Sequence, residues 1–147
     1  MTGKENDQQT EQTTRSIKPR AAMPMYERHV SSEVPSKIAF VVLSSGKVVE
    51  QAFSHELTLG RTISAPSPPT HVDMTEHMSK DAGVSRIHAR LSVVNDSVCV
   101  EDLGSTNGTL LNGFIVEPFT QVGVKDGDML ELGKFKIKLQ FKHADTR

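Results

Sequence analysis

The sequence contains no tryptophan, only one tyrosine and only one cysteine, Cys99. A single cysteine cannot form a disulfide within the chain, and low cysteine usage is typical of reducing compartments inside cells. The shortage of aromatic rings argues against a platform that stacks nucleic-acid bases. No apolar run approaches the ~18 residues of a membrane-spanning helix, and the N-terminal segment lacks the apolar stretch of a secretory signal. We therefore expect an intracellular protein, in the nucleus or the cytoplasm.

Neither sign of charge dominates, because 17 basic residues oppose 18 acidic ones and leave a net charge of −1. A balanced chain has no general attraction for nucleic acid or for an anionic membrane, so we expect neither as a partner. Any site for an anion must then be local and built from a few residues.

The usual catalytic and metal-binding patterns are missing from the sequence as well. There is no G-x-S-x-G or Walker-type loop, and no histidine stands at a zinc-type spacing from Cys99. Asp126 and Asp128 in "KDGD" are better explained by a charged turn before a strand than by an acid–base pair. We therefore expect no enzyme, no metal and no cofactor. Cys99 is expected to fill a strand position as a small apolar side chain.

The composition of the chain changes at Pro35. Residues 1–35 are rich in Gln, Thr, Glu, Lys and Arg, and such a segment buries too little apolar area to offset the entropy of ordering. We expect a disordered N-terminal tail at 1–35, one folded domain at 36–142 and a short C-terminal tail at 143–147.

The folded part has the pattern of short strands separated by Gly, Pro and Asn turns. Residues 135–141 show the clearest two-residue period of apolar and polar side chains. The same period in 86–94 predicts that Ile87 and Ala89 face the core and that His88 points away from it. Further strands are expected at 37–43, 47–53, 55–60, 71–74, 97–103, 117–122 and 128–132. About ten short strands without a convincing helix predict an all-β sandwich.

Polar residues interrupt this pattern at strand ends. Gly60-Arg61 ends one strand, Ser85-Arg86 begins another, and Thr106-Asn107-Gly108 lies between two others. Loops at one end of a sandwich can converge in space. Together these residues supply guanidinium, hydroxyl and amide groups without a carboxylate. Such a set suits a phosphate dianion, which has several acceptor oxygens.

Each of these features has a simpler explanation when taken alone. Arg61 can be a solvated charge at a strand end, Ser85 can make a local backbone hydrogen bond, and Asn107-Gly108 can be a hairpin turn. A second pair, Asn112-Gly113, is expected to be a plain turn. The occurrence of all of them in order at strand ends favours the phosphate site.

The motifs resemble those of the forkhead-associated (FHA) domain family. They are "LGR" at 59–61, "VSRIHARL" at 84–91, "DLGSTNGTLLNG" at 102–113 and "DGDMLELG" at 126–133. The resemblance covers about 36–142. It implies a two-sheet β-sandwich of about 11 strands and a non-catalytic module. Such a module binds phosphothreonine peptides through loops at one edge and mediates phosphorylation-dependent protein–protein interaction in signalling or complex assembly.

The resemblance also implies roles for the residues that contact the ligand. Arg61 would make the main charged contact with the phosphate, and Ser85 would donate a hydroxyl hydrogen bond to it. Arg86 stands where the family often has a further phosphate-contacting side chain. Thr106 and Asn107 would line the loop that holds the peptide, with Asn107 bonded to the peptide backbone.

Other motif residues are expected to support the site. Gly60 would allow the chain to pass closely, and Gly108 and Asn112 would form turns. His88 would tie the phosphate loops together from behind, although the sequence also fits a solvated strand histidine at this position.

The sequence departs from the family pattern between Arg61 and Asp73, where the loop is long and rich in proline, and again before Val84. In this family the loops before the Ser-Arg motif usually select the residue three places after the phosphothreonine. Lys80, Asp81 and Gly83 are the candidates for that selection, and the sequence does not rank the residues they would prefer.

Two further possibilities concern the partner. The sandwich can instead be a phosphate-independent scaffold that uses the proline-rich loop at 64–70 or a sheet face, but the intact Arg61, Ser85, Thr106 and Asn107 favour the phosphopeptide reader. The N-terminal tail contains Thr10, Thr13 and Thr14. If one of them were phosphorylated, it could dock on the domain's own site or on that of a second copy.

Overall fold

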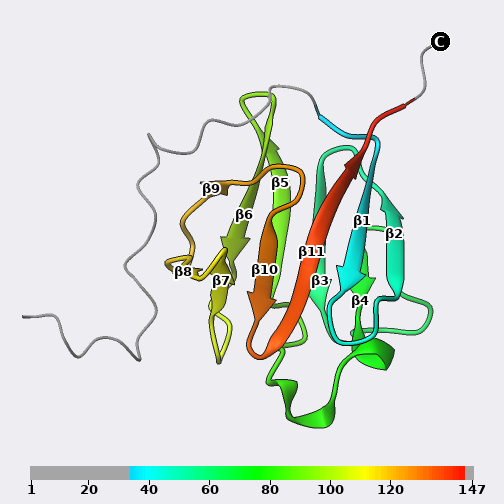
Figure 1. Ribbon diagram of the computed structural model, residues 1–147, viewed down its shortest axis with the longest axis vertical. Coiled ribbons are helices and arrows are strands. Elements are labelled where there is room, and N and C mark those ends of the chain that lie inside the picture. Colours follow the sequence, from blue (N-terminus) through cyan, green and yellow to red (C-terminus); the bar gives the residue numbers. More distant parts are fainter. Residues whose placement is uncertain (1–33, 145–147) are drawn as a thin grey trace, which may run out of the picture.

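The computed structural model describes residues 34–144 and shows eleven strands in two sheets (Figure 1). The expected all-β sandwich is therefore confirmed. The expected disordered tail and its threonines fall almost entirely outside the described residues, as does most of 143–147. The strands are β1 (Lys37–Val42), β2 (Val48–Ala52), β3 (Glu56–Gly60), β4 (His71–Asp73), β5 (Ala89–Val94), β6 (Ser97–Asp102), β7 (Thr109–Leu111), β8 (Phe114–Ile115), β9 (Val122–Gly123), β10 (Met129–Leu132) and β11 (Phe135–Lys142).

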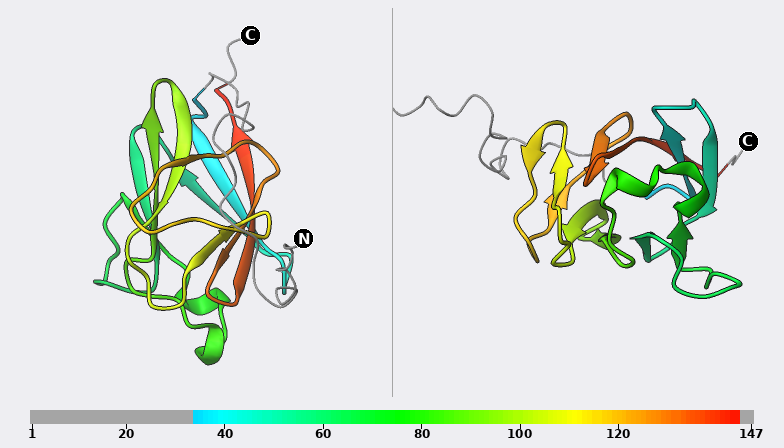
Figure 2. Two further views of the ribbon diagram at one scale, coloured as in Figure 1. Left: turned by 90° about the vertical axis from the view of Figure 1, so that its left-hand side faces the viewer. Right: turned by 90° about the horizontal axis from the view of Figure 1, so that it is seen from below.

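The strands form a six-stranded sheet in the order β2-β1-β11-β10-β7-β8 and a five-stranded sheet in the order β4-β3-β5-β6-β9. All pairings between neighbouring strands are antiparallel except β3–β4, which is parallel. Figure 2 shows the two layers from the side. β10 and β11 bury alternate residues on the inner face, as a two-residue period requires, whereas β1 and β6 also bury consecutive residues.

The core confirms the clearest sequence pattern. In β11, Phe135, Ile137 and Leu139 are buried while Lys136 and Lys138 are exposed. Cys99 is a buried free thiol in β6, where the sequence placed it. No helix within residues 34–144 is long and apolar enough to cross a membrane.

The strand expected at 86–94 begins only at Ala89. The two side chains before it, Ile87 and His88, face opposite to the expected directions. Ile87 is 47% exposed, whereas His88 is fully buried. Residues 86–87 form a bend, and the ladder with β3 starts only at the pair Leu59↔Ala89. Alternation fixes the direction of a side chain only within an extended strand, so extending the period back to Ile87 was wrong.

The strand expected at 117–122 is also mostly absent. Only Val122 and Gly123 form a strand, β9, and Pro118 makes an isolated parallel bridge to Asp102. Phe119 has a φ of 62° and is 68% exposed, and its backbone N–H donates to the carbonyl of Asp102 at 2.8 Å. A left-handed residue interrupts an extended chain, which is why the segment crosses the end of the sheet instead of joining it.

The long segment before Val84 contains two short 3-10 helices, η4 (Thr75–His77) and η5 (Lys80–Ala82). They lie at the same end of the sandwich as the β1–β2 and β10–β11 turns (Figure 1). The fold thus gathers several loops from both sheets at one end.

Candidate functional site

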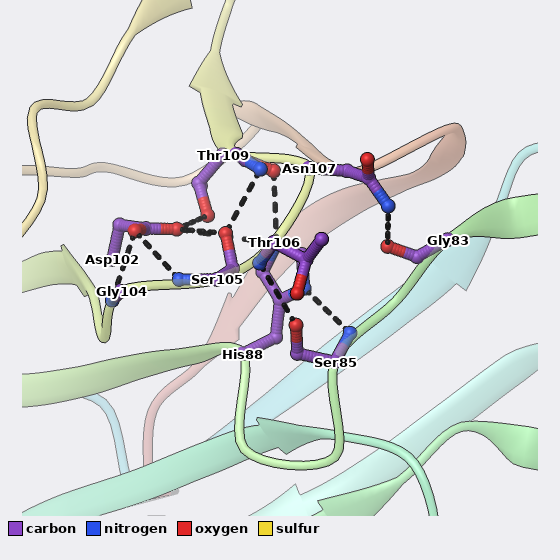
Figure 3. Close-up of polar contacts among 10 residues, drawn as sticks. Gly83, Ser85, His88, Asp102, Gly104, Ser105, Thr106, Asn107 and Thr109 are labelled. Carbon is purple, nitrogen blue, oxygen red and sulfur yellow. Dashed lines mark hydrogen bonds and ion pairs between the residues drawn. The ribbon is translucent and has the colours of Figure 1, made fainter.

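The phosphate loops predicted from the sequence meet at this end of the sandwich. Arg61 follows β3, Ser85 lies just before β5, and Thr106-Asn107 connects β6 to β7. Figure 3 shows the hydrogen bonds that hold the Ser85 and Thr106 segments against each other. The residues are therefore together in space although they are far apart in the sequence.

Gly60 brings the Arg61 segment against the Ser85 segment. A Cβ atom at this position would lie 2.1 Å from the carbonyl oxygen of Arg86, a distance that no side chain tolerates. The close approach lets the backbone N–H of Arg61 donate to the carbonyl oxygens of Arg86 at 3.1 Å and Ser85 at 3.3 Å. The absence of a side chain at Gly60 thus sets the position of Arg61 relative to Ser85.

The side chain of Arg61 is exposed and lies against the segment before β5. Its Nε donates to the carbonyl of Val84 at 2.6 Å. Its own carbonyl accepts from Nε2 of the buried His71 at 2.8 Å, and Nδ1 of that ring lies 2.7 Å from the hydroxyl of Thr58. Arg61 is therefore held at its Nε and its carbonyl, which leaves the outer guanidinium nitrogens facing solvent in a fixed fork.

Ser85 joins this cluster to the loop between β6 and β7. Its hydroxyl oxygen accepts from the backbone N–H of Thr106 at 3.1 Å. The hydroxyl proton is then available to donate to a ligand, because a serine hydroxyl both donates and accepts. Arg86 is exposed beside it.

His88 is a fully buried link behind the two loops. Its Nδ1 accepts from the backbone N–H of Ser85 at 3.0 Å, so the ring proton must lie on Nε2, which donates to the carbonyl of Gly108 at 2.9 Å. Burial lowers the pKa of His88, against the smaller raising effects of the Gly108 carbonyl and Asp102. The neutral ring is thus the form that connects Ser85 to Gly108 (Figure 3).

A carboxylate that the sequence analysis did not single out organises the second loop. Buried Asp102 accepts from the hydroxyls of Ser105 and Thr109, each at 2.6 Å, and from the backbone N–H groups of Gly104 and Ser105 at 3.1 Å. Burial alone would raise the pKa of Asp102, but the hydrogen bonds from Ser105 and Thr109 outweigh it and hold this pKa below its ordinary value. An Asp at a strand end with Gly and Ser two and three residues later, as in Asp102-Leu103-Gly104-Ser105, is the sequence signal of such a turn.

Asn107 links the same loop to the segment before β5. Its Nδ2 donates to the carbonyl of Gly83 at 2.9 Å, and Gly83 has a φ of 76°. This hydrogen bond uses the amide nitrogen, and the side-chain oxygen of Asn107 can accept a further hydrogen bond.

The candidate specificity residues divide between two hollows. Lys80 and Gly83 line a groove of about 420 Å³ together with Arg61. Asp81 instead lines a neighbouring depression of about 350 Å³ with Gly83, Asn107 and Lys134.

Asn112 and the two aspartates of "KDGD" lie away from these loops. Asn112 and Gly113 have φ angles of 50° and 87°, so they form the expected tight turn. Nδ2 of Asn112 donates to Asp128 at 3.0 Å, and its Oδ1 accepts from the N–H of Met129 at 2.9 Å. Asp126 accepts from the N–H of Phe141 at 2.8 Å. These contacts hold turns in place, as the structural interpretation of the aspartates predicts.

Comparison with known proteins gives a consistent result. A family model described as FHA domain matches residues 57–133. An FHA domain-containing protein of Arabidopsis thaliana is 45% identical over 56 residues, 38% of this chain and 14% of that protein. The glycogen accumulation regulator GarA of Mycobacterium tuberculosis is 39% identical over 57 residues, 39% of this chain and 33% of the regulator. The matched stretches are thus a third or less of these relatives.

Solved structures share the fold. The solution structure of the FHA domain of an Arabidopsis thaliana hypothetical protein has a TM-score of 0.59 and 27% identity, covering 82% of this chain and 98% of that domain. The MEK1 FHA domain in complex with a pThr peptide of HOP1 has a TM-score of 0.51 and 18% identity, covering 74% of this chain and 97% of that domain.

Proposed function

The chain belongs to the FHA domain family, whose members are phosphothreonine-peptide recognition modules, and from this premise we propose that its own loop cluster binds phosphothreonine. Arg61 supplies the principal positive charge, Ser85 donates its hydroxyl proton, and Arg86 adds a second guanidinium. Thr106 lines the loop, and the oxygen of Asn107 accepts from the peptide backbone.

The observation that carries this proposal is the fixed arrangement of donors around Arg61. The backbone of Arg61 is held by the close approach of the chain at Gly60, and its Nε is held by the hydrogen bond to Val84. Ser85 is held by hydrogen bonds to His88 and Thr106. Donors that are already oriented lose little entropy when they bind a phosphate, and a guanidinium fork matches its oxygens. A loop cluster of this kind needs no catalytic group, so we propose a binding module and not an enzyme.

Two further statements belong to the proposal. A phosphorylated threonine of the tail, Thr10, Thr13 or Thr14, is proposed to dock on the same site in its own chain or in a second copy. The protein is proposed to act inside the cell, in the nucleus or the cytoplasm, where kinases and threonine-phosphorylated partners meet. The single cysteine supports this location.

The deciding experiment measures the binding of a degenerate phosphothreonine peptide library and of its unphosphorylated counterpart. Wild type is expected to bind only phosphorylated members, and Arg61→Ala is expected to lose at least about tenfold in affinity because a charge-assisted pair is removed. Arg90→Ala is the matched control, since Arg90 pairs with Glu101 at 3.0 Å on β5 and β6. It should bind like wild type.

Two outcomes of this experiment would contradict the proposal. Equal binding by wild type and Arg61→Ala, or binding that ignores the phosphate, contradicts the reader function. It would favour a phosphate-independent scaffold. The sequences recovered from the library also give the residue preferred after the phosphothreonine, which we propose that Lys80, Asp81 and Gly83 influence.

A further inference from the structure

A second groove lies across the Met78–Ala82 segment from the groove that contains Arg61. It has a volume of about 440 Å³. Its lining residues are Leu43, Ser44, His77, Met78, Ser79, Ala82, Lys134, Phe135 and Lys136. Met78 and Ser79 line both grooves, so a single stretch of chain forms the wall between them. We call the second hollow the lysine groove, after Lys134 and Lys136.

Backbone hydrogen bonds fasten the walls of the lysine groove to the phosphate loops. Lys134 donates its N–H to the carbonyl of Ala82 at 2.7 Å, and Gly133 donates to the carbonyl of Gly108 at 3.0 Å. On the other side, the N–H of Leu43 donates to the carbonyl of Lys136 at 3.1 Å. The groove is therefore preformed and keeps a fixed position relative to Gly108, which His88 also holds.

The lysine groove is cationic over an apolar floor. Lys134 and Lys136 are both exposed, and no carboxylate is among the lining residues. Glu131 stands opposite Lys136 in the β10–β11 ladder, but neither lysine forms an ion pair with any other residue of 34–144. At the rim, His77 contacts Glu76 at 3.3 Å. Among residues 34–144, the two ammonium groups are thus free of a direct ion pair.

A small depression connects the lysine groove to the phosphate site. It is lined by Gly83 and Asn107 from the phosphate loops, and by Asp81 and Lys134. An extended peptide advances about 3.3 Å per residue. A ligand held at Asn107 therefore reaches Lys134 within a few residues, without leaving the surface.

We propose that the lysine groove binds Asp or Glu side chains of the same polypeptide whose phosphothreonine is held at Arg61. The charge of Lys134 and Lys136 requires an anionic occupant. No arginine lines the groove, and a lysine ammonium binds an anion as a compact point charge. We assign the Asp and Glu carboxylates, because a peptide carries these anions without any further modification. Leu43, which is 43% exposed, and Met78 contact the aliphatic parts of those side chains. This inference rests on the proposed function and extends it to a ligand class, acidic phosphothreonine peptides.

The test compares peptides that share one phosphothreonine core. One has neutral Gly-Ser extensions, and two others have a Glu/Asp extension on either the N-terminal or the C-terminal side. Wild type is expected to bind one acidic peptide about fivefold more tightly than the neutral peptide, as exposed charge pairs allow. In Lys134→Gln/Lys136→Gln this gain should disappear while the affinity for the neutral peptide stays unchanged.

The matched control is Lys125→Gln/Lys142→Gln. Lys125 lies in the β9–β10 connection and Lys142 ends β11, so this variant removes the same charge at the opposite end of β10 and β11 from the turn that joins them (Figure 1). It should keep the gain. Loss of the gain in both double variants, or no gain in wild type, overturns the inference. An acidic peptide with unphosphorylated threonine that binds as tightly as the phosphorylated one also overturns it, because the groove would then be an independent anion site. If the neutral phosphopeptide itself fails to bind wild type, the proposed function fails first and the inference falls with it.

Discussion

At the scale of single residues, His88 couples the site to protonation. Its Nδ1 can accept from Ser85 only while the ring is neutral, and burial lowers its pKa in the folded protein. An unfolded chain protonates this histidine near pH 6.5, whereas the folded chain does not. Below that pH the unfolded state binds more protons, so the free energy of unfolding must decrease as the pH falls.

We therefore predict that urea denaturation shows a loss of stability between about pH 7 and pH 5, of at most ~1.4 kcal/mol per pH unit from this residue. His88→Gln should be less stable than wild type at pH 7.5 but should show a shallower pH dependence. Asp102 does not contribute to this pH dependence. Its pKa is lowered in the folded protein, so the stability that it provides is lost only as the pH falls below about 4. An unchanged slope in His88→Gln would exclude the assigned role.

Some residues of the candidate site could be identified from the sequence, and others could not. Arg61, Ser85 and Asn107 were identified because their chemistry is unusual at strand ends. Asp102 was not, because an acid at a strand end looks like an ordinary solvated charge. Its function as an acceptor for Ser105 and Thr109 depends on a loop that folds back, and only the structure shows that geometry.

At the scale of elements, the two Asn-Gly pairs have different contacts. Asn107 forms a hydrogen bond with Gly83, in a loop of the proposed site. Asn112 forms hydrogen bonds with Asp128 and Met129, at the start of β10. We predict that Asn107→Ala weakens phosphopeptide binding by about tenfold and leaves thermal stability nearly unchanged.

Asn112→Ala should leave the affinity unchanged and lower the free energy of unfolding by about 1–2 kcal/mol, since buried Asp128 loses a partner. Isothermal titration calorimetry and thermal melts of both variants measure these effects, and the reverse assignment would refute the division.

Strand prediction succeeded where alternation continues through a paired strand and failed at the ends. Residues 135–141 follow the pattern because β11 is paired with β1 and β10 along its length. Ile87 and His88 break it because a bend precedes β5, and Phe119 breaks it through its left-handed backbone. Such departures are set by contacts between loops, which a local pattern does not contain.

At the scale of the whole molecule, the site draws on both sheets. β3, β5 and β6 belong to one sheet and β7, β10 and β11 to the other, and the Thr106–Gly108 loop passes between them. His88 and Gly133 both donate to the carbonyl of Gly108, from opposite sheets. The relative position of the sheets therefore determines the distance between Ser85 and Asn107.

The proposed docking of a phosphorylated tail threonine also belongs to the scale of the whole chain. A tethered ligand competes at an effective concentration in the millimolar range. We predict that the 147-residue chain phosphorylated on the tail binds an added phosphothreonine peptide at least about tenfold more weakly than the Thr10→Ala/Thr13→Ala/Thr14→Ala variant treated with the same kinase. Fluorescence anisotropy measures the difference, and a dependence on protein concentration distinguishes docking in a second copy. Equal affinities would exclude self-docking.

The chain enters and leaves the sandwich side by side. Ser36 donates its N–H to the carbonyl of Lys142 at 2.9 Å, where β1 and β11 begin and end their pairing. Figure 1 places this point at the end of the molecule opposite the phosphate loops. A label, a surface linker or a fused protein attached at either side of the domain would therefore leave the loops facing solution. The same geometry makes the domain transferable, because it can be inserted between two neighbouring residues of another protein's surface loop and still present its binding face outward.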